Sequence, residues 1–246
     1  MLEVQKLTVA YDSSNTPVIE ELSFALPIGG LLAVVGASGC GKTTLINTLA
    51  GVIAPQSGQI LFQSEILSPQ TTRIGLIPQS YGLLPWKNVR SNILFCMGNT
   101  KVQAHELLHI CERLGISLLL ERYPHELSGG QAQRVALARA FIMQPRLLLM
   151  DEPFAALDIA SAHRAKQLTL ALFEEYGATG IVVTHRLEEA MYLATHIAVM
   201  GNKGSFIEIC ANPWQGKEVQ QDSAYLHFAQ ELRQKLLQAV EEGEAV

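Results

Sequence analysis

The sequence predicts an α/β fold in which a parallel sheet is combined with an antiparallel β subdomain and a helical subdomain. Three short, wholly apolar runs are typical of buried parallel strands: residues 31–35, 147–150 and 181–183. Residues 2–9 and 22–26 alternate in strand fashion, which indicates antiparallel strands. Between residues 86 and 143 apolar residues recur at helical spacing, so we expect an inserted helical subdomain there.

The composition narrows the class of protein. The chain has 246 residues, enough for one large α/β domain. Its 18 Lys and Arg against 23 Asp and Glu give a formal net charge of −5, which is the wrong sign for a protein that binds the phosphate backbone of nucleic acid. We therefore expect no nucleic-acid partner. The four cysteines lie far apart without a CxxC spacing, so neither a disulfide framework nor a zinc site is indicated.

We expect a single domain with an internal division. Residues 1–85 and 144–205 are predicted to form the β subdomain and the core, residues 86–143 the helical subdomain, and residues 206–246 a C-terminal extension that ends in a helix. Two long stretches without charge, 22–41 and 43–64, contain too many Gly, Pro and polar residues to span a membrane. The charged start of the chain does not read as a secretory signal, and we expect the protein to stay in the cytoplasm.

A glycine-rich loop follows the first buried strand. It reads Gly36-Ala37-Ser38-Gly39-Cys40-Gly41-Lys42-Thr43, matches GxxxxGK[ST] and opens a predicted helix over 42–50. Glycines let successive backbone N–H groups point at phosphate oxygens, and the helix start presents its positive dipole end to the same anion. We therefore predict a nucleoside triphosphate site in which Lys42 bridges the β- and γ-phosphates. Thr43 is placed to ligate Mg²⁺, and Thr44 can support it.

Two adjacent acids follow the strand 147–150. We expect this strand to neighbour the strand that precedes the phosphate loop, so that both deliver their polar ends to one sheet edge. Asp151 is then the Mg²⁺ partner, and Glu152 is the general base for the water that attacks the γ-phosphate. Alone, such a pair is more often a solvated helix start; the phosphate loop favours the catalytic interpretation.

A second anion site is predicted at Leu127-Ser128-Gly129-Gly130-Gln131, which precedes an amphipathic helix over 132–141. Ser128 is a good N-cap, and the two glycines expose backbone N–H groups. One chain cannot easily use two such sites on one triphosphate. The economical arrangement is that this turn completes a nucleotide bound to another copy.

These motifs in this order resemble the ATP-binding cassette (ABC) ATPases, and the likeness runs from residue 2 to about residue 200. The resemblance implies the P-loop NTPase core of that family and hydrolysis of ATP with Mg²⁺. It also implies that two cassettes pack head to tail, with Ser128, Gly130 and Gln131 acting in trans. We call residues 127–131 the signature turn.

The resemblance assigns four further residues. Gln79 looks like the loop glutamine that contacts Mg²⁺ and senses the membrane partner, and His185 looks like the switch histidine that contacts the γ-phosphate. Asp158 resembles the loop that links the two sites, and Tyr11 resembles the aromatic residue that stacks on adenine.

The segment 79–93, with Leu-Leu-Pro-Trp at 83–86, is similar to the importers of taurine, alkanesulfonates or nitrate. This resemblance implies a peripheral subunit on the cytoplasmic face of the inner membrane. Its partners would be permease subunits and, indirectly, an extracytoplasmic substrate-binding protein. Trp86 would line a groove for a helix of the membrane subunit, or would belong to the core of the helical subdomain. Two other functions stay open: a soluble ABC ATPase without a transport role, and the motor of an exporter.

Overall fold

The structure is a computed structural model, and it describes residues 1–11, 16–98, 104–217, 219 and 222–244. The chain forms two compact units. The first consists of Met1–Thr72 and Thr179–Val246, and the second of Arg73–Ala178. Among the described residues, none of the helices combines the length and the hydropathy that a membrane span requires.

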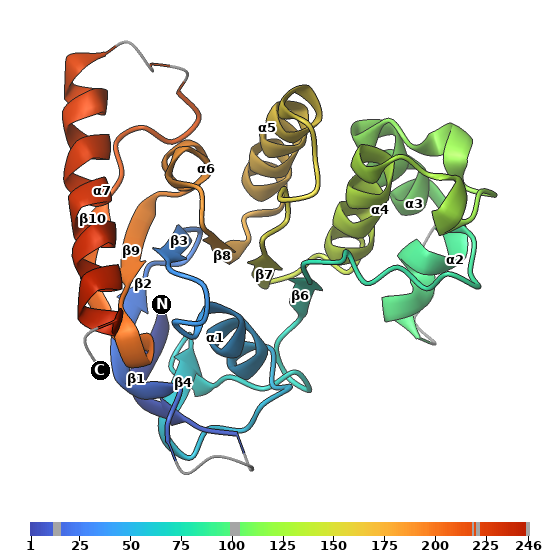
Figure 1. Cartoon of the computed structure of the whole chain (residues 1–246). Helices are drawn as coiled ribbons and strands as arrows, with labels where there is room; N and C mark the ends of the chain where they lie inside the picture. Colours follow the sequence, from blue (N-terminus) through green and yellow to red (C-terminus); the bar gives the residue numbers. More distant parts are fainter. Residues whose placement is uncertain (12–15, 99–103, 218, 220–221, 245–246) are drawn as a thin grey trace. The chain divides into compact units, whose positions relative to one another are not determined.

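The first unit contains the predicted antiparallel sheet. Its strands lie in the order β2 (Ile19–Leu26), β1 (Leu2–Val9), β4 (Ser57–Phe62) and β5 (Glu65–Ile66). Figure 1 draws β1 and β2 in dark blue. The strand β2 begins at Ile19, three residues before the predicted 22–26. Within these three residues Glu21 has a φ of +49°, at an irregularity in the pairing with β1. Such a bulge interrupts the alternation of apolar and polar residues by which strands are predicted.

The first unit also contains a parallel sheet around β3 (Leu31–Gly36), all six residues of which are buried. The strand β3 pairs in parallel with β8 (Thr179–Thr184) and β9 (His196–Met200), and β9 pairs antiparallel with β10 (Phe206–Ala211). The strand that ends in Asp151 was expected beside β3. This expectation is wrong, because both edges of β3 are taken by β8 and β9.

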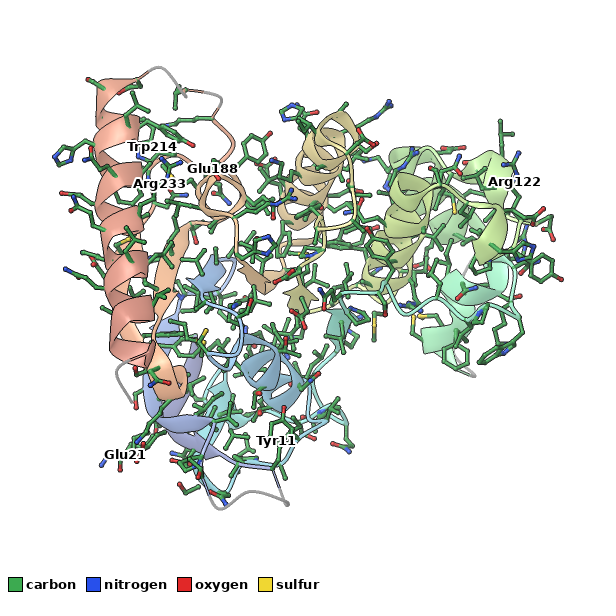
Figure 2. The ribbon with its side chains drawn as sticks, in the orientation of Figure 1. Tyr11, Glu21, Arg122, Glu188, Trp214 and Arg233 are labelled. Atoms are coloured by element: carbon green, nitrogen blue, oxygen red, sulfur yellow. The ribbon has the colours of Figure 1, made fainter. Side chains whose placement is uncertain are left out.

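Three helices and a 3₁₀ turn complete the first unit: α1 (Lys42–Leu49), α6 (Leu187–Leu193), η4 (Asn202–Gly204) and α7 (Ser223–Glu244). The predicted C-terminal helix is α7, which contacts β9 and α6 (Figure 1). Its apolar face buries Tyr225, Ala229, Leu232 and Ala239. At the edge of this contact Arg233 donates to the Glu188 carboxylate on α6 at 2.5 Å, a pair labelled in Figure 2.

The second unit combines two parallel strands with helices. The strands are β6 (Ile74–Ile77) and β7 (Leu147–Asp151). The α-helices are α2 (Val89–Leu94), α3 (Ala104–Leu114), α4 (Gly129–Phe141) and α5 (Ile159–Tyr176). The 3₁₀ turns are η1 (Phe95–Met97), η2 (Ser117–Leu119) and η3 (Pro124–Glu126). The helix α4 is central, because it packs against α2, α3, α5 and β6. Its Phe141 meets Phe173 of α5 edge to face, with ring centroids 5.8 Å apart.

Candidate functional site

The phosphate loop links β3 to α1 in the first unit. Gly39 and Gly41 have φ angles of +83° and +109°, a left-handed backbone that favours glycine. Lys42 is only 7% exposed, and its ammonium donates to the carbonyls of Gly36 at 2.9 Å and Ala37 at 2.6 Å. A buried ammonium that donates to backbone carbonyls at the start of a helix is suited to a polyanionic ligand, so the residues of this loop fit a triphosphate.

Cys40 lies inside the loop. Burial raises the pKa of its thiol, and the Lys42 ammonium, 3.8 Å from Sγ, opposes this shift. The thiol is therefore protonated at neutral pH, and it adds no negative charge that would repel the phosphates of a bound nucleotide.

Tyr11 lies beside α1, the helix that follows the phosphate loop. Its hydroxyl is 3.0 Å from Oγ1 of Thr44, which is buried, while 44% of Tyr11 is exposed (Figure 2). Thr43, the preceding residue of α1, is exposed. Thr44 is thus engaged within the chain. The outward position of Thr43 suits its predicted role as a metal ligand, and the exposed ring of Tyr11 suits stacking on a base.

His185 follows β8 at the edge where the phosphate loop leaves β3. The register pairs Val35 with Thr184, so Gly36 and His185 are the next residues of two adjacent parallel strands. Glu189, which is 4% exposed, accepts hydrogen bonds from the residues on either side of His185. The Thr184 hydroxyl donates to its Oε2 at 2.8 Å, and the Arg186 guanidinium donates to its Oε1 at 3.3 Å. Glu189 is not among the residues predicted from the sequence. Its signal was an acid among the buried apolar residues of α6.

The acidic pair ends β7 in the second unit. Because Ile77 of β6 pairs with Met150 of β7, Gln79 and Asp151 both follow the same edge of this strand pair. Asp151 is 7% exposed, and Gln79 is exposed. Glu152 has a φ of +45° directly before Pro153, a conformation that is unfavourable by roughly 1–3 kcal/mol and is typical of functional positions.

The signature turn begins α4. The Ser128 hydroxyl accepts from the N–H of Gln131 at 3.3 Å, and the Gln131 side-chain oxygen accepts from the N–H of Ser128 at 2.9 Å, which forms a capping box. Among the described residues no acceptor is found for the N–H groups of Gly129 and Gly130. These two donors are available to a ligand.

The start of α5 lies beside the signature turn. Asp158 caps α5 by accepting from the N–H of Ser161 at 3.0 Å, and hydrogen bonds from Ser161 lower the pKa of the Asp158 carboxyl. A Cβ on Gly130 would lie 3.5 Å from Ser161, an ordinary contact, and Gly130 has no positive φ. The chain's own packing therefore does not require glycine at this position, whereas the close approach of an outside ligand would.

The structure brings the predicted residues together in three groups. The first unit holds Tyr11, His185 and the loop from Gly36 to Thr44. The second unit holds Gln79, Asp151 and Glu152 at one strand edge, and Ser128, Gly130, Gln131 and Asp158 at two helix starts.

Trp86 lies on the surface of the second unit. It is 71% exposed, so the interpretation as subdomain core is wrong. Two other large apolar side chains of this unit, Phe95 and Leu118, are 56% and 96% exposed.

Comparison with known proteins gives a consistent result. A family model described as ABC transporter matches residues 19–155. The chain is 39% identical over 204 residues to the taurine import ATP-binding protein TauB of Escherichia coli O157:H7, which covers 81% of this chain and 79% of that relative. It is also 41% identical over 216 residues to the putrescine transport ATP-binding protein PotG of Escherichia coli K12, covering 85% of this chain and 56% of that relative.

A solved structure shares the fold. The cbiO1 protein from Clostridium perfringens, described as part of the ABC transporter complex cbiONQ, matches with a TM-score of 0.77 and 28% sequence identity. The match covers 86% of this chain and 88% of that one. The predicted α/β architecture with an antiparallel β subdomain is thereby confirmed.

Proposed function

We propose a mechanism from the premise that this chain belongs to the ABC transporter family, as the ATP-binding subunit of an importer that hydrolyses ATP for transport. Two copies face each other, and each nucleotide is held between the phosphate loop of one copy and the signature turn of the other. Closure of the two copies moves the membrane subunits. Hydrolysis then allows the copies to separate.

Each residue has a separate role in this mechanism. Lys42 and the loop N–H groups bind the β- and γ-phosphates, and Tyr11 stacks on the base. Glu152 accepts the proton of the attacking water, and His185 contacts the γ-phosphate. Thr43, Gln79 and Asp151 would hold Mg²⁺, which supplies positive charge for the phosphate oxygens when bound.

The second copy contributes the rest of the site. Its Ser128, Gly130 and Gln131 bind the γ-phosphate side of the nucleotide, and its Asp158 links the two sites. The observation that carries this proposal is the start of α4, where two N–H groups lack an acceptor among the described residues and where Gly130 is not required by the chain's own packing.

The assignment of the base is tested by Glu152→Gln. We expect ATP binding to persist, turnover to fall by roughly 10²- to 10⁴-fold because the general base is lost, and a dimer to accumulate with ATP. Equilibrium nucleotide binding, phosphate release and size-exclusion chromatography measure these three properties. Lys42→Ala is the matched variant, because it should weaken binding itself. Turnover of Glu152→Gln at the parental rate would show that another group is the base.

We further propose that the imported solute is taurine or a similar small sulfonate or nitrate-like anion. The likeness to TauB and the Leu-Leu-Pro-Trp segment support this. The chain then lies peripherally on the cytoplasmic face of the inner membrane. There the exposed Trp86 receives a helix of a permease subunit, and a substrate-binding protein delivers the solute from outside.

The 41% identity to PotG favours a second candidate solute, a polyamine. Reconstitution with the membrane subunits and the binding protein separates the two candidates. We expect taurine to raise ATP turnover and putrescine to leave it unchanged. The reverse result would favour the polyamine.

A further inference from the structure

The helix of the signature turn also contacts the loop of Gln79. Arg139 lies near the C-terminal end of α4, and two nitrogens of its guanidinium donate to the carbonyls of two successive residues. Nη1 donates to the carbonyl of Gly82 at 2.6 Å, and Nη2 donates to that of Tyr81 at 2.5 Å. These carbonyls begin two residues after Gln79. The contact joins positions 57 and 58 residues apart in the sequence.

The turn that Arg139 holds is strained and poorly held by its own residues. Tyr81 and Gly82 have φ angles of +62° and +59°, and the left-handed region is unfavourable for tyrosine. The Tyr81 side chain is buried, yet its hydroxyl has no partner among the described residues. Within the turn one hydrogen bond runs from the Tyr81 N–H to the Pro78 carbonyl at 2.8 Å, and Pro78 has no N–H to add another.

Arg139 is an unusual residue for this place if its role is only to fill space. Burial lowers the pKa of its guanidinium, and no described carboxylate forms a salt bridge with it. An apolar side chain could cover the same surface without placing a charge there. The planar fork, in contrast, fixes two carbonyl directions at once, which an apolar side chain or a single ammonium cannot do.

We propose that Arg139 is a positioning residue for Gln79. It holds the turn 78–82 in the conformation that presents Gln79 at the strand edge of Asp151, and it ties this turn to the helix that begins with the signature turn. The proposal rests on the function proposed above for Gln79 as a ligand of Mg²⁺.

A double-mutant cycle in the full chain tests the proposal. The variants are Arg139→Gln, Gln79→Ala and both together. The readouts are ATP turnover and the Mg²⁺ requirement, which we define as the Mg²⁺ concentration that gives half of the maximal Mg²⁺-dependent gain in equilibrium ATP binding. We expect Arg139→Gln to lower turnover roughly ten- to hundredfold, because Gln79 is displaced, and to raise the Mg²⁺ requirement. We expect no further loss when it is added to Gln79→Ala. Arg139→Lys should fall between, since it restores one donor direction.

Arg134→Gln is the matched control. Arg134 lies on the same helix and also donates to two carbonyls, those of Gly130 at 3.2 Å and Leu114 at 3.0 Å. It does not touch the Gln79 loop. Its effect on turnover should multiply with that of Gln79→Ala, and it should leave the Mg²⁺ requirement unchanged.

A second variant disturbs the fork from the opposite side. A Cβ on Gly82 would lie 3.0 Å from Pro78 and 3.4 Å from Nη2 of Arg139, and the φ of Gly82 is unfavourable for alanine. Because Gly82 is exposed, Gly82→Ala should leave the core intact. It therefore tests the proposal even if Arg139→Gln fails to fold. It should raise the Mg²⁺ requirement in the same direction.

Two results would overturn the proposal in distinguishable ways. If the losses of Arg139→Gln and Gln79→Ala multiply, or if the Mg²⁺ requirement stays unchanged, Arg139 has only a structural role and the proposed function is unaffected. If Gln79→Ala alone changes neither turnover nor the Mg²⁺ requirement, the role proposed for Gln79 is wrong, and that of Arg139 is wrong with it.

Discussion

Gly36 and Gly130 occupy two parts of the proposed nucleotide site for different physical reasons. A Cβ on Gly36 would lie 2.5 Å from the carbonyl of Met200 and 2.8 Å from Sγ of Cys40, so the fold itself requires glycine there. A Cβ on Gly130 would make only contacts of 3.5 Å or longer within the chain. The first glycine is needed by the fold, and the second by the ligand that we propose.

Gly130→Ala should therefore separate stability from activity. Alanine is favoured over glycine in a helix by about 1 kcal/mol, so we expect the free energy of unfolding to stay constant or to rise. The added methyl group should hold the nucleotide away from the helix start and lower turnover by about 10²-fold. Urea unfolding and phosphate release measure the two effects.

Gly36→Ala is the contrasting variant. Its Cβ cannot be accommodated without a backbone shift, so the free energy of unfolding should fall by about 1–3 kcal/mol. A Gly130→Ala protein that hydrolyses ATP at the parental rate would contradict a ligand at the start of α4.

Among the elements, α7 is held mainly by its apolar face. Leu232 is 2% exposed, whereas Leu237 on the same helix is 62% exposed. Leu232→Ala should lower the free energy of unfolding by about 2–5 kcal/mol, because a buried side chain is lost and a cavity remains. Leu237→Ala should change it by less than about 0.5 kcal/mol. Equal effects in denaturant titrations would show that α7 is not docked as described.

The ion pair at the edge of α7 is a weaker contribution. The side chains of Arg233 and Glu188 are 61% and 54% exposed, so water screens their attraction. Exposed pairs of this kind are worth about 0–1 kcal/mol. This pair therefore contributes little to the docking of α7 compared with the buried apolar face of the helix.

The elements differ in how far the sequence predicts them. The strands β3, β7 and β8 are predicted correctly because each contains a run of at least three consecutive apolar residues. The strand β6 is not, because Gly75 interrupts it. A Cβ at Gly75 would lie 2.8 Å from the Leu148 side chain, so glycine is required here by packing against β7. Because β7 lies about seventy residues further along the chain, the local sequence pattern does not reveal this requirement.

The site shows the same division. The phosphate loop, the acidic pair and the signature turn are contiguous motifs whose chemistry is visible in the sequence. The roles of Glu189 and Arg139 depend on which turn each side chain reaches in the fold. For Arg139 that turn lies 57 residues earlier in the chain, and no local spacing indicates it.

For the whole molecule, the proposed pairing of two copies makes a prediction about mixtures. Lys42→Ala breaks the phosphate loop, and Ser128→Ala breaks the signature turn. In a mixed dimer of these variants one site combines an intact loop with an intact signature turn. In an equimolar mixture with free exchange of copies, half of the dimers are mixed and each has one intact site of two. About a quarter of the parental ATP turnover should therefore return, whereas each variant alone is inactive.

Lys42→Ala mixed with Glu152→Gln is the control. Both residues serve the nucleotide bound to their own chain, so no mixed dimer gains an intact site, and turnover should stay at the level of the separate variants. Recovery in this control, or none in the first mixture, would mean that the signature turn does not act on the nucleotide of the other copy.

The capping box of α4 has a consequence for such a cycle. In the structure Ser128 and Gln131 already satisfy each other's backbone N–H groups, so the helix start is stable while it waits for a second copy. When the nucleotide arrives, its phosphate oxygens replace water at the N–H groups of Gly129 and Gly130, and each such exchange yields about 1.5–3 kcal/mol because the acceptor is charged. Binding of that strength is readily reversible, which an ATPase requires if its two copies must separate after each round of hydrolysis.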